Sequence, residues 1–482
     1  MSEKNVIQKS ISWSLLSEVA AKFITPITSM LLARILTPND FGVIAICNMV
    51  VTFTDIIKDA GFGKYMIQRD FCDKKTREDY ASVAFWSNLL LSIFLFCFII
   101  LNQDIIASYL GNKEYGAAIS ISCIQLMIAS ISSIQTNLLR REFEYKKLFI
   151  VRILISAVPL LITVPLAFVT KSFWALIIGN LIGALCNAVT LTYLSDWKPR
   201  VFYSVKILKE MFSFSFWSLC EGLAHWLIFW IDTFIAAQVF SDYYIGLYKN
   251  SANMVMSIMG MVSASMSPVL LSVLSRLKSK EDLFYYTFLN IQKLMLYLII
   301  PMGLGLFCYR KIITLILFGA RWSEASDIVG MWGLMMMCSL IFYSFTAELY
   351  KAKGIPKVLF LFQCSYLAFL IPVCMLTTRY GFWNFVYGRC FSILEFVIMS
   401  LILLKVTFKV NIKETLCNMI NPLIASLVIP ISYLMMNTLM ITDLLEFVGM
   451  MISTFSYFVV VHMFLVKDIN NLRSLIKNEK MV

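Results

Sequence analysis

Ionisable side chains occur inside stretches of this chain that are otherwise strongly apolar. A charge at membrane depth is costly, so each such residue is a candidate for function. Cationic side chains at such places could bind an anion, and carboxylates or a histidine could hold a proton or a cation. The candidates are Glu18, Lys22, Arg34, Asp55, Arg152, Glu221, His225, Asp232, Lys249 and Arg389.

Several candidates have spacings that place them on one face of a helix. Glu18 and Lys22 are one turn apart, as are Glu221 and His225. Asp232 follows Glu221 by eleven residues, about three turns, and therefore belongs to the same face. Because histidine titrates near neutral pH, His225 beside Glu221 could sense protons. Ordinary alternatives are an i,i+4 ion pair for Glu18 with Lys22 and a hydrogen-bonded core histidine for His225.

The other candidates also have structural interpretations. Asp55 and Arg152 are expected close to the cytoplasmic interface, where long side chains reach water and helix ends are capped. Arg34 is expected at the outer mouth, where it could bind a ligand or anchor a turn. For Arg389 the sequence offers no clear partner, so a structural role stays open.

The segments that carry these residues are long enough to cross a membrane. Hydrophobic residues make up 60% of the chain, charged residues 15%, and the mean hydropathy is +0.79. Long unbroken apolar runs exclude the alternating pattern of barrel strands. We therefore predict an all-α polytopic membrane protein with about 14 transmembrane helices. The segments are approximately 10–33, 40–60, 82–101, 115–138, 149–169, 173–193, 211–238, 245–272, 285–308, 326–346, 358–377, 383–405, 419–438 and 446–466.

The connections alternate between rich and poor in Lys and Arg, which predicts the orientation. Cytoplasmic loops retain positive charge, so both termini are expected in the cytoplasm. The first segment contains Glu18 and Lys22 and lacks a small-residue cleavage site, so we expect it to be retained. The net charge of +12 is dispersed over many loops, which favours anionic lipid headgroups and not nucleic acid as the partner. The basic connections are 64–77, 140–147, 198–209, 276–280, 351–357, 405–413 and the tail 467–480.

A weak internal repeat is visible at an offset of 204 residues. At this offset Trp13-Ser14-Leu15 falls on Trp217-Ser218-Leu219, and Gly42 falls on Gly246. The first helix thus matches the seventh, as in transporters built from parallel repeats. We predict two pseudo-symmetric six-helix lobes, 1–197 and 198–410, followed by a C-terminal helix pair and cytoplasmic tail at 411–482.

The sequence gives no sign of a cofactor, a metal site or an enzyme. Its twelve cysteines lie mostly in apolar segments, without a CxxC pair or a histidine at metal-ligand spacing. No GxxxxGK[ST] sequence is present, so energy must come from an ion gradient or from the substrate gradient. All connections are short, which leaves no soluble catalytic domain. A polysaccharide polymerase or ligase, which would carry a large outer loop, is accordingly disfavoured.

The joint between the first two segments carries a recognisable sequence. Leu31–Gly42 ends in LARILTPNDFG and resembles the LARxLxPxDFG hallmark of bacterial polysaccharide flippases, the Wzx-type exporters of O-antigen, capsule and colanic acid. Further stretches are similar to this family in matching order over roughly residues 10–360. They are Gly61–Arg69, Leu138–Phe143, Trp230–Asp232 with Ile245–Tyr248, Pro268–Arg276 and Gly319–Trp322.

The resemblance implies a fold of the multidrug/oligosaccharidyl-lipid/polysaccharide exporter superfamily in the bacterial inner membrane. It implies alternating-access transfer of undecaprenyl-diphosphate-linked oligosaccharide to the periplasmic leaflet, with polysaccharide polymerase machinery as a further partner. On this interpretation Lys22, Arg34, Lys249, Arg152 and Arg389 would bind substrate. Ion coupling or cavity hydration would fall to the acidic residues and the histidine, namely Glu18, Asp232, Glu221, His225 and Asp55. The alternative is a drug/cation antiporter of the same superfamily.

Overall fold

The computed structural model describes residues 24–277, 281–408, 412–436 and 442–479, and the regular elements in these ranges are helical. Twelve helical segments among them are long and apolar enough to cross a membrane. This confirms the all-helical polytopic class. The first expected segment, 10–33, lies mostly outside the described residues. The part that the structure describes belongs to the short helix Ile24–Ile35. The eighth corresponds to α11 (Asp242–Arg276), which is not one of the twelve.

The chain divides into two compact units, residues 1–250 and 251–482, and the division falls within α11. The lobes expected from the repeat, 1–197 and 198–410, stay a prediction. Unit 1 contains the first part of α11 and the helices α2 (Pro38–Asp59), α3 (Phe62–Gln68), α4 (Lys74–Leu101), α5 (Gln103–Tyr109), α6 (Gly116–Arg141), α7 (Tyr145–Val158), α8 (Val164–Thr170), α9 (Trp174–Leu194) and α10 (Val205–Ala237).

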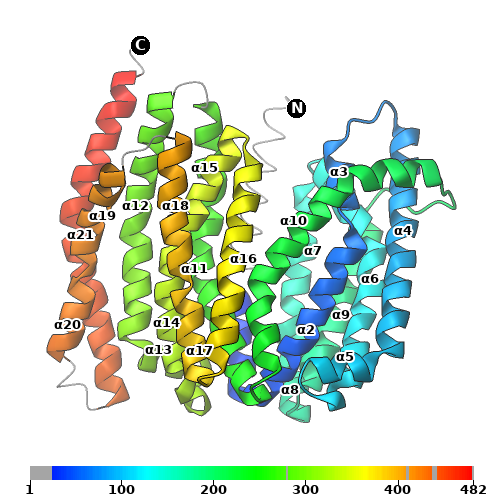
Figure 1. The fold of residues 1–482 in the computed structure, drawn as a ribbon, viewed down its shortest axis with the longest axis horizontal. Helices are drawn as coiled ribbons and strands as arrows, with labels where there is room; N and C mark the ends of the chain where they lie inside the picture. Colours follow the sequence, from blue (N-terminus) through cyan, green and yellow to red (C-terminus); the bar gives the residue numbers. More distant parts are fainter. Residues whose placement is uncertain (1–23, 278–280, 409–411, 437–441, 480–482) are drawn as a thin grey trace. The chain divides into compact units, whose positions relative to one another are not determined.

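In unit 1, α6 packs against α2, α4 and α9, and α10 packs against α2 and α3. Figure 1 shows α3 at one end of this bundle and α5 and α8 at the opposite end. Small residues allow the close packing, because Cys47, Ala118 and Cys123 are all almost fully buried in the core. A π-helical turn at Pro159–Thr163 separates α7 from α8, as expected where proline removes a backbone donor.

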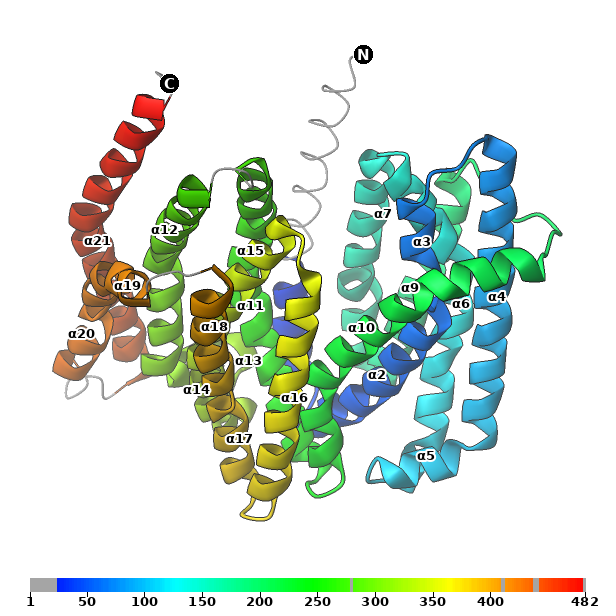
Figure 2. The ribbon, with the colours of Figure 1, turned by 45° about the horizontal axis from the view of Figure 1, so that its top comes forward.

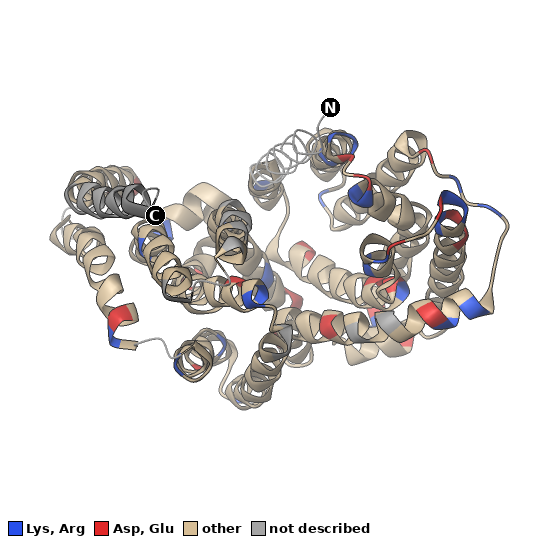
Figure 3. Cartoon of the chain, turned by 90° about the horizontal axis from the view of Figure 1, so that it is seen from above, with Lys and Arg blue, Asp and Glu red and all other residues tan. Residues whose placement is uncertain are grey.

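The basic connections of unit 1 meet at the α3 end, which is the expected cytoplasmic end. The Arg141 guanidinium donates to the carbonyl oxygens of Met66 and Ile67 at 3.0 and 3.1 Å, and so fixes α3 on α6. Figure 3, which views this end, shows basic and acidic residues interspersed. The ion pairs here are Arg69–Glu210, Arg77–Glu142 at 2.9 Å, Arg200–Glu78 at 2.7 Å and Lys147–Asp196 at 3.5 Å. The loops that the positive-inside pattern assigned to one side therefore lie together.

Unit 2 is also a helical bundle, in which α12 packs against α14, α19 and α20. Helices α20 and α21 lie side by side (Figure 2). Tyrosines join the last helices to the bundle, since the Tyr457 hydroxyl donates to the Tyr297 carbonyl oxygen. Besides the rest of α11, its helices are α12 (Glu281–Cys308), α13 (Arg310–Phe318), α14 (Ser326–Cys338), α15 (Phe345–Lys353), α16 (Pro356–Thr378), α17 (Phe382–Phe391), α18 (Ile393–Phe408), α19 (Ile412–Ser426), α20 (Val428–Met436) and α21 (Asp443–Glu479).

Candidate functional site

A buried ion pair joins α10 to the start of α11 inside unit 1. The Lys249 ammonium lies 3.9 Å from Asp232 Oδ1, and their side chains are only 3% and 1% exposed. The two residues belong to an antiparallel helix hairpin, because the connection from Gln238 to Ser241 is short. An ion pair at this depth loses its hydration, so its stability depends on further hydrogen bonds.

Those hydrogen bonds come from the same hairpin. Asp232 Oδ2 accepts from the Tyr248 hydroxyl at 2.7 Å. Asp232 Oδ1 accepts from the backbone N–H and the hydroxyl of Thr233, at 2.6 and 3.0 Å. Lys249 donates to the Phe229 carbonyl oxygen at 2.6 Å. Each charge therefore has several polar partners in place of water.

Two aromatic rings complete the surroundings of Lys249. Its Nζ lies 4.1 Å from the centre of the Phe229 ring and 4.2 Å from that of Trp230. The negative face of a ring attracts a cation most strongly where water is excluded. The arrangement can hold a cation at membrane depth beside a carboxylate, which is the chemistry needed for anion recognition or for proton coupling.

The LARILTPNDFG stretch shapes the start of α2, at the end of unit 1 opposite α3. Asp40 Oδ2 accepts from the Thr37 backbone N–H at 2.9 Å and from the Thr37 hydroxyl at 2.6 Å. Asp40 Oδ1 accepts from the Phe173 backbone N–H at 2.9 Å, which ties α2 to the start of α9. Pro38 occupies the first turn, where no backbone donor is needed. Arg34 is exposed on the preceding helix. The hydrogen bonds of Asp40 show that Thr37–Asp40 caps the start of α2.

The remaining candidates of unit 1 lie apart from the buried pair. Glu221 is mostly exposed and forms an ion pair with Lys64 of α3 at 3.0 Å, while His225 is exposed. Asp55 accepts from Lys58 at 2.5 Å, and it is Lys58 that is buried. Arg152 is half-buried on α7. Glu18 and Lys22 lie outside the described residues.

Arg389 belongs to unit 2, where tyrosine and serine side chains surround it. It is 5% exposed, and its Nη1 donates to the Tyr366 hydroxyl at 2.8 Å and to Ser392 Oγ at 3.4 Å. Its guanidinium carbon lies 5.4 Å from the Trp332 ring centre. The cation is thus held by neutral polar atoms and by an aromatic face.

Sequence reasoning missed the residues that complete these groups. Thr233 carries no recognisable signal, because any hydroxyl in an apolar segment could serve. Tyr248 belongs to the family-like stretch Ile245–Tyr248, but that stretch does not reveal its partner. Asp40 did carry a sequence signal, because Thr37 and Asp40 have the spacing of a capping box. Within the described residues, no three His, Cys, Asp or Glu side chains are grouped so that they could hold a metal ion.

Residues 31–327, which include the capped start of α2 and the buried Asp232–Lys249 pair, match the family described as "Polysaccharide biosynthesis protein". This match covers more than half of the 482 residues. The chain belongs to this family. The expected relationship to polysaccharide transporters is confirmed, and this polysaccharide biosynthesis protein is a multi-pass protein of the bacterial membrane.

Individual relatives cover most of this polysaccharide biosynthesis protein. An uncharacterized membrane protein in the cps region of Klebsiella pneumoniae is 25% identical over 439 residues, 89% of this chain and 87% of the relative. The succinoglycan biosynthesis transport protein ExoT of Rhizobium meliloti is 23% identical over 342 residues, 69% and 67% of the two chains. The lipid II flippase MurJ in an inward closed conformation is similar in structure, with a TM-score of 0.78 and 16% identity over 95% of this chain and 100% of MurJ. At that identity the likeness establishes the fold.

Proposed function

We propose that this protein moves a lipid-linked oligosaccharide, a sugar repeat unit on undecaprenyl diphosphate, from the cytoplasmic to the outer leaflet. The observation that carries the proposal is the family match over residues 31–327. The names of a succinoglycan transport protein and of a lipid II flippase among the similar proteins support it. The transferred unit would supply O-antigen, capsule or exopolysaccharide synthesis, with polysaccharide polymerase machinery as the partner that uses it.

Transfer between leaflets makes and breaks no covalent bond, so the protein needs binding and conformational change only. We propose alternating access, with 1–197 and 198–410 as the two moving lobes and 411–482 as an additional helix pair. The substrate places a diphosphate and sugars at membrane depth. A cationic site must therefore be offered there, because an unpaired phosphate charge in hydrocarbon is prohibitively costly.

Lys249 is the cation that we assign first to the phosphate. Its charge is already desolvated, so exchange of the Asp232 carboxylate for a diphosphate replaces one anionic partner by another. A proton on Asp232 would weaken its attraction for Lys249 and favour this exchange. Protonation of Asp232 would thereby be coupled to diphosphate binding at Lys249. Arg34, Arg152, Arg389 and Lys22 are further proposed substrate contacts. Glu221, His225, Asp55 and Glu18 are proposed to assist coupling or hydration.

Reconstitution in liposomes tests the transport proposal. The wild-type protein should transfer a short undecaprenyl-diphosphate oligosaccharide to the outer leaflet, where an impermeant sugar-oxidising reagent reaches it. Lys249→Gln should slow transfer by about tenfold, equivalent to about 1.4 kcal/mol of lost interaction, and Lys249→Arg should retain most of the rate. Lys113→Ala, at an exposed lysine, is the matched control. Thermal unfolding of each variant separates loss of transport from loss of folding.

Gene deletion in the host provides the second test. We expect undecaprenyl-diphosphate oligosaccharide to accumulate on the cytoplasmic side and polymer to disappear from the surface. Normal surface polysaccharide together with new sensitivity to cationic drugs would refute the proposal and establish the antiporter alternative.

A further inference from the structure

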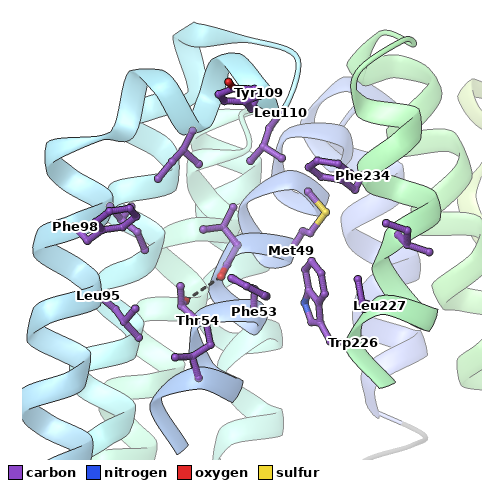
Figure 4. Close-up of a pocket in the computed structure, with 15 residues that line it drawn as sticks. Met49, Phe53, Thr54, Leu95, Phe98, Tyr109, Leu110, Trp226, Leu227 and Phe234 are labelled. Atoms are coloured by element: carbon purple, nitrogen blue, oxygen red, sulfur yellow. Dashed lines mark hydrogen bonds between the residues drawn. The ribbon is translucent and has the colours of Figure 1, made fainter. Parts of the chain in front are cut away.

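An apolar groove lies between α2, α4, α5 and α10 within unit 1 (Figure 4). Its volume is about 560 Å³. Met49, Ile99 and Leu110 are buried at its floor, whereas Phe53, Phe98 and Tyr109 are exposed at 38%, 53% and 71%. The groove therefore opens outward past aromatic side chains. Its volume is within the range of about 300–1,000 Å³ that is typical of small-molecule sites.

Inside the groove, the polar atoms of Thr54 and Trp226 are already bonded within the protein. The Thr54 hydroxyl donates to the carbonyl oxygens of Val50 and Val51 at 2.9 and 3.0 Å. Trp226 Nε1 donates to the Thr52 hydroxyl at 3.1 Å, which joins α10 to α2. A sugar or phosphate in the groove would lose its hydration and gain few hydrogen bonds. A hydrocarbon chain has no hydration or hydrogen bonds to lose, so hydrocarbon is the ligand class that the lining selects.

One end of the groove lies at the end of the bundle opposite α3 (Figure 1). Its wall on α4 consists of Leu95, Phe98 and Ile99, close to the end of that helix at Leu101, and α5 closes the same end. This end is opposite α3 and is thus the expected outer side (Figure 1). Along α2 the lining runs from Met49 to Ile57, which is about 12 Å of helix in the half of α2 that leads to α3. The groove therefore extends from the expected outer end into the middle of the bundle.

Tyr109 marks the mouth of the groove at the outer end of the bundle. Its ring lines the groove, and the residue is mostly exposed. Tyrosine is favoured at the membrane–water interface because its ring is apolar and its hydroxyl is polar. A lipid with its chain in the groove would accordingly hold its polar head beside Tyr109.

Helix α10 links the groove to the buried ion pair. Trp226, Ile231 and Phe234 face the groove, whereas Asp232 and Phe229 face α11 through their contacts with Lys249. The same helix thus contributes an apolar face to one site and a charged face to the other. A ligand in the groove would contact the helix that holds Asp232.

We propose that this groove binds part of the isoprenoid tail of the transported lipid. The inference rests on the proposed function, because that function supplies a lipid with a polyprenyl tail. An isoprenoid chain carries a methyl branch on every unit, so it fills a wide groove with aromatic walls better than an unbranched acyl chain does. Because the tail already lies in hydrocarbon, its preference for the groove depends on how closely it packs against the lining and not on removal from water.

Photo-crosslinking tests the groove directly. The full-length protein is placed in nanodiscs of phosphatidylethanolamine and phosphatidylglycerol, and a polyprenyl phosphate that carries a diazirine on its tail is added. After illumination, labelled peptides should come from the groove faces of α2, α4 and α10. Unlabelled undecaprenyl phosphate should suppress this labelling, whereas additional phosphatidylglycerol should not. Equal suppression by phosphatidylglycerol would show an ordinary lipid contact and overturn the proposal.

A pair of tryptophan variants on α4 provides the control. Leu95→Trp fills the groove and should lower labelling about tenfold, whereas Leu90→Trp changes a side chain that is 57% exposed and should leave it unchanged. Equal labelling of the two variants would overturn the inference. Transfer by the wild-type protein in liposomes tests the proposed function separately. Transfer without groove labelling refutes only the groove, and groove labelling without transfer refutes only the flippase assignment.

Discussion

Gly42 and Gly246 lie directly against each other near the starts of α2 and α11. A Cβ atom on Gly42 would lie 2.0 Å from the Asp242 carbonyl oxygen, and one on Gly246 would lie 1.8 Å from the Pro38 carbonyl oxygen. Asp242 and Gly246 follow Pro38 and Gly42 by the same 204 residues. The contact is therefore reciprocal: equivalent positions of the repeat pack on each other, and the missing side chains allow the two backbones to approach.

Alanine at either glycine should destabilise the protein. The opposing atoms belong to the backbone and cannot turn away, so we expect Gly42→Ala and Gly246→Ala each to cost about 1–3 kcal/mol, as overpacking does. Gly305→Ala on α12 is the control, because nothing lies within 4 Å of its added Cβ. Thermal unfolding in detergent measures the effect. Equal stability of Gly42→Ala and Gly305→Ala would contradict the close approach.

Asp40 should stabilise the start of α2. Asp40→Ala removes the acceptor for the Thr37 backbone N–H and for the Phe173 backbone N–H. Loss of a cap typically costs about 0.5–2 kcal/mol, and the second donor places this position at the upper end. Asn39→Ala, at the exposed neighbouring residue, should leave the stability unchanged. The midpoint of thermal unfolding measures both effects, and a shift of the same size for the two variants would contradict the capping role of Asp40.

The Asp232–Lys249 pair should be costly to break and much less costly to remove. Asp232→Leu or Lys249→Met alone leaves one buried charge without its partner, for an expected loss of about 3–5 kcal/mol. The double variant carries no charge, so its loss should be far smaller than the sum. Unfolding midpoints of the four proteins give this comparison. A stable double variant that transfers lipid at the wild-type rate would show that the pair is purely structural.

Glu210 should make stability depend on pH at the α3 end of unit 1. Hydrogen bonds from Tyr80 and then from Arg69 lower the pKa of this carboxyl from its ordinary value of 4.5. A pKa that is lower in the folded state adds stability above the unfolded pKa, and the gain disappears as the pH falls through the folded pKa. Because both side chains are partly exposed, we expect at most about 1 kcal/mol at neutral pH.

Comparison with Glu210→Gln isolates this contribution. The variant should unfold at a lower temperature than the wild type near pH 7, and the difference should shrink as the pH falls below the ordinary pKa of about 4.5. A constant difference across this range would show that the carboxylate charge is not responsible.

The sequence by itself determined the helical membrane architecture and the family. Apolar runs of membrane length require helices because the bilayer leaves no other partner for the backbone groups. LARILTPNDFG contains its own cap in Thr37 and Asp40, so the local sequence defines the start of α2. Both features depend on residues close together in the chain, and a single sequence reveals them.

Only the tertiary structure decided which charges meet. Glu221 was expected beside His225, one turn along the helix, yet its carboxylate pairs with Lys64, which is 157 residues away. Glu210 receives its hydrogen bond from Tyr80 across 130 residues. Asp232 and Lys249 were both candidates, but their pairing depends on how α10 and α11 rotate about their axes. That rotation follows from the packing of the whole bundle, which no local pattern of residues specifies.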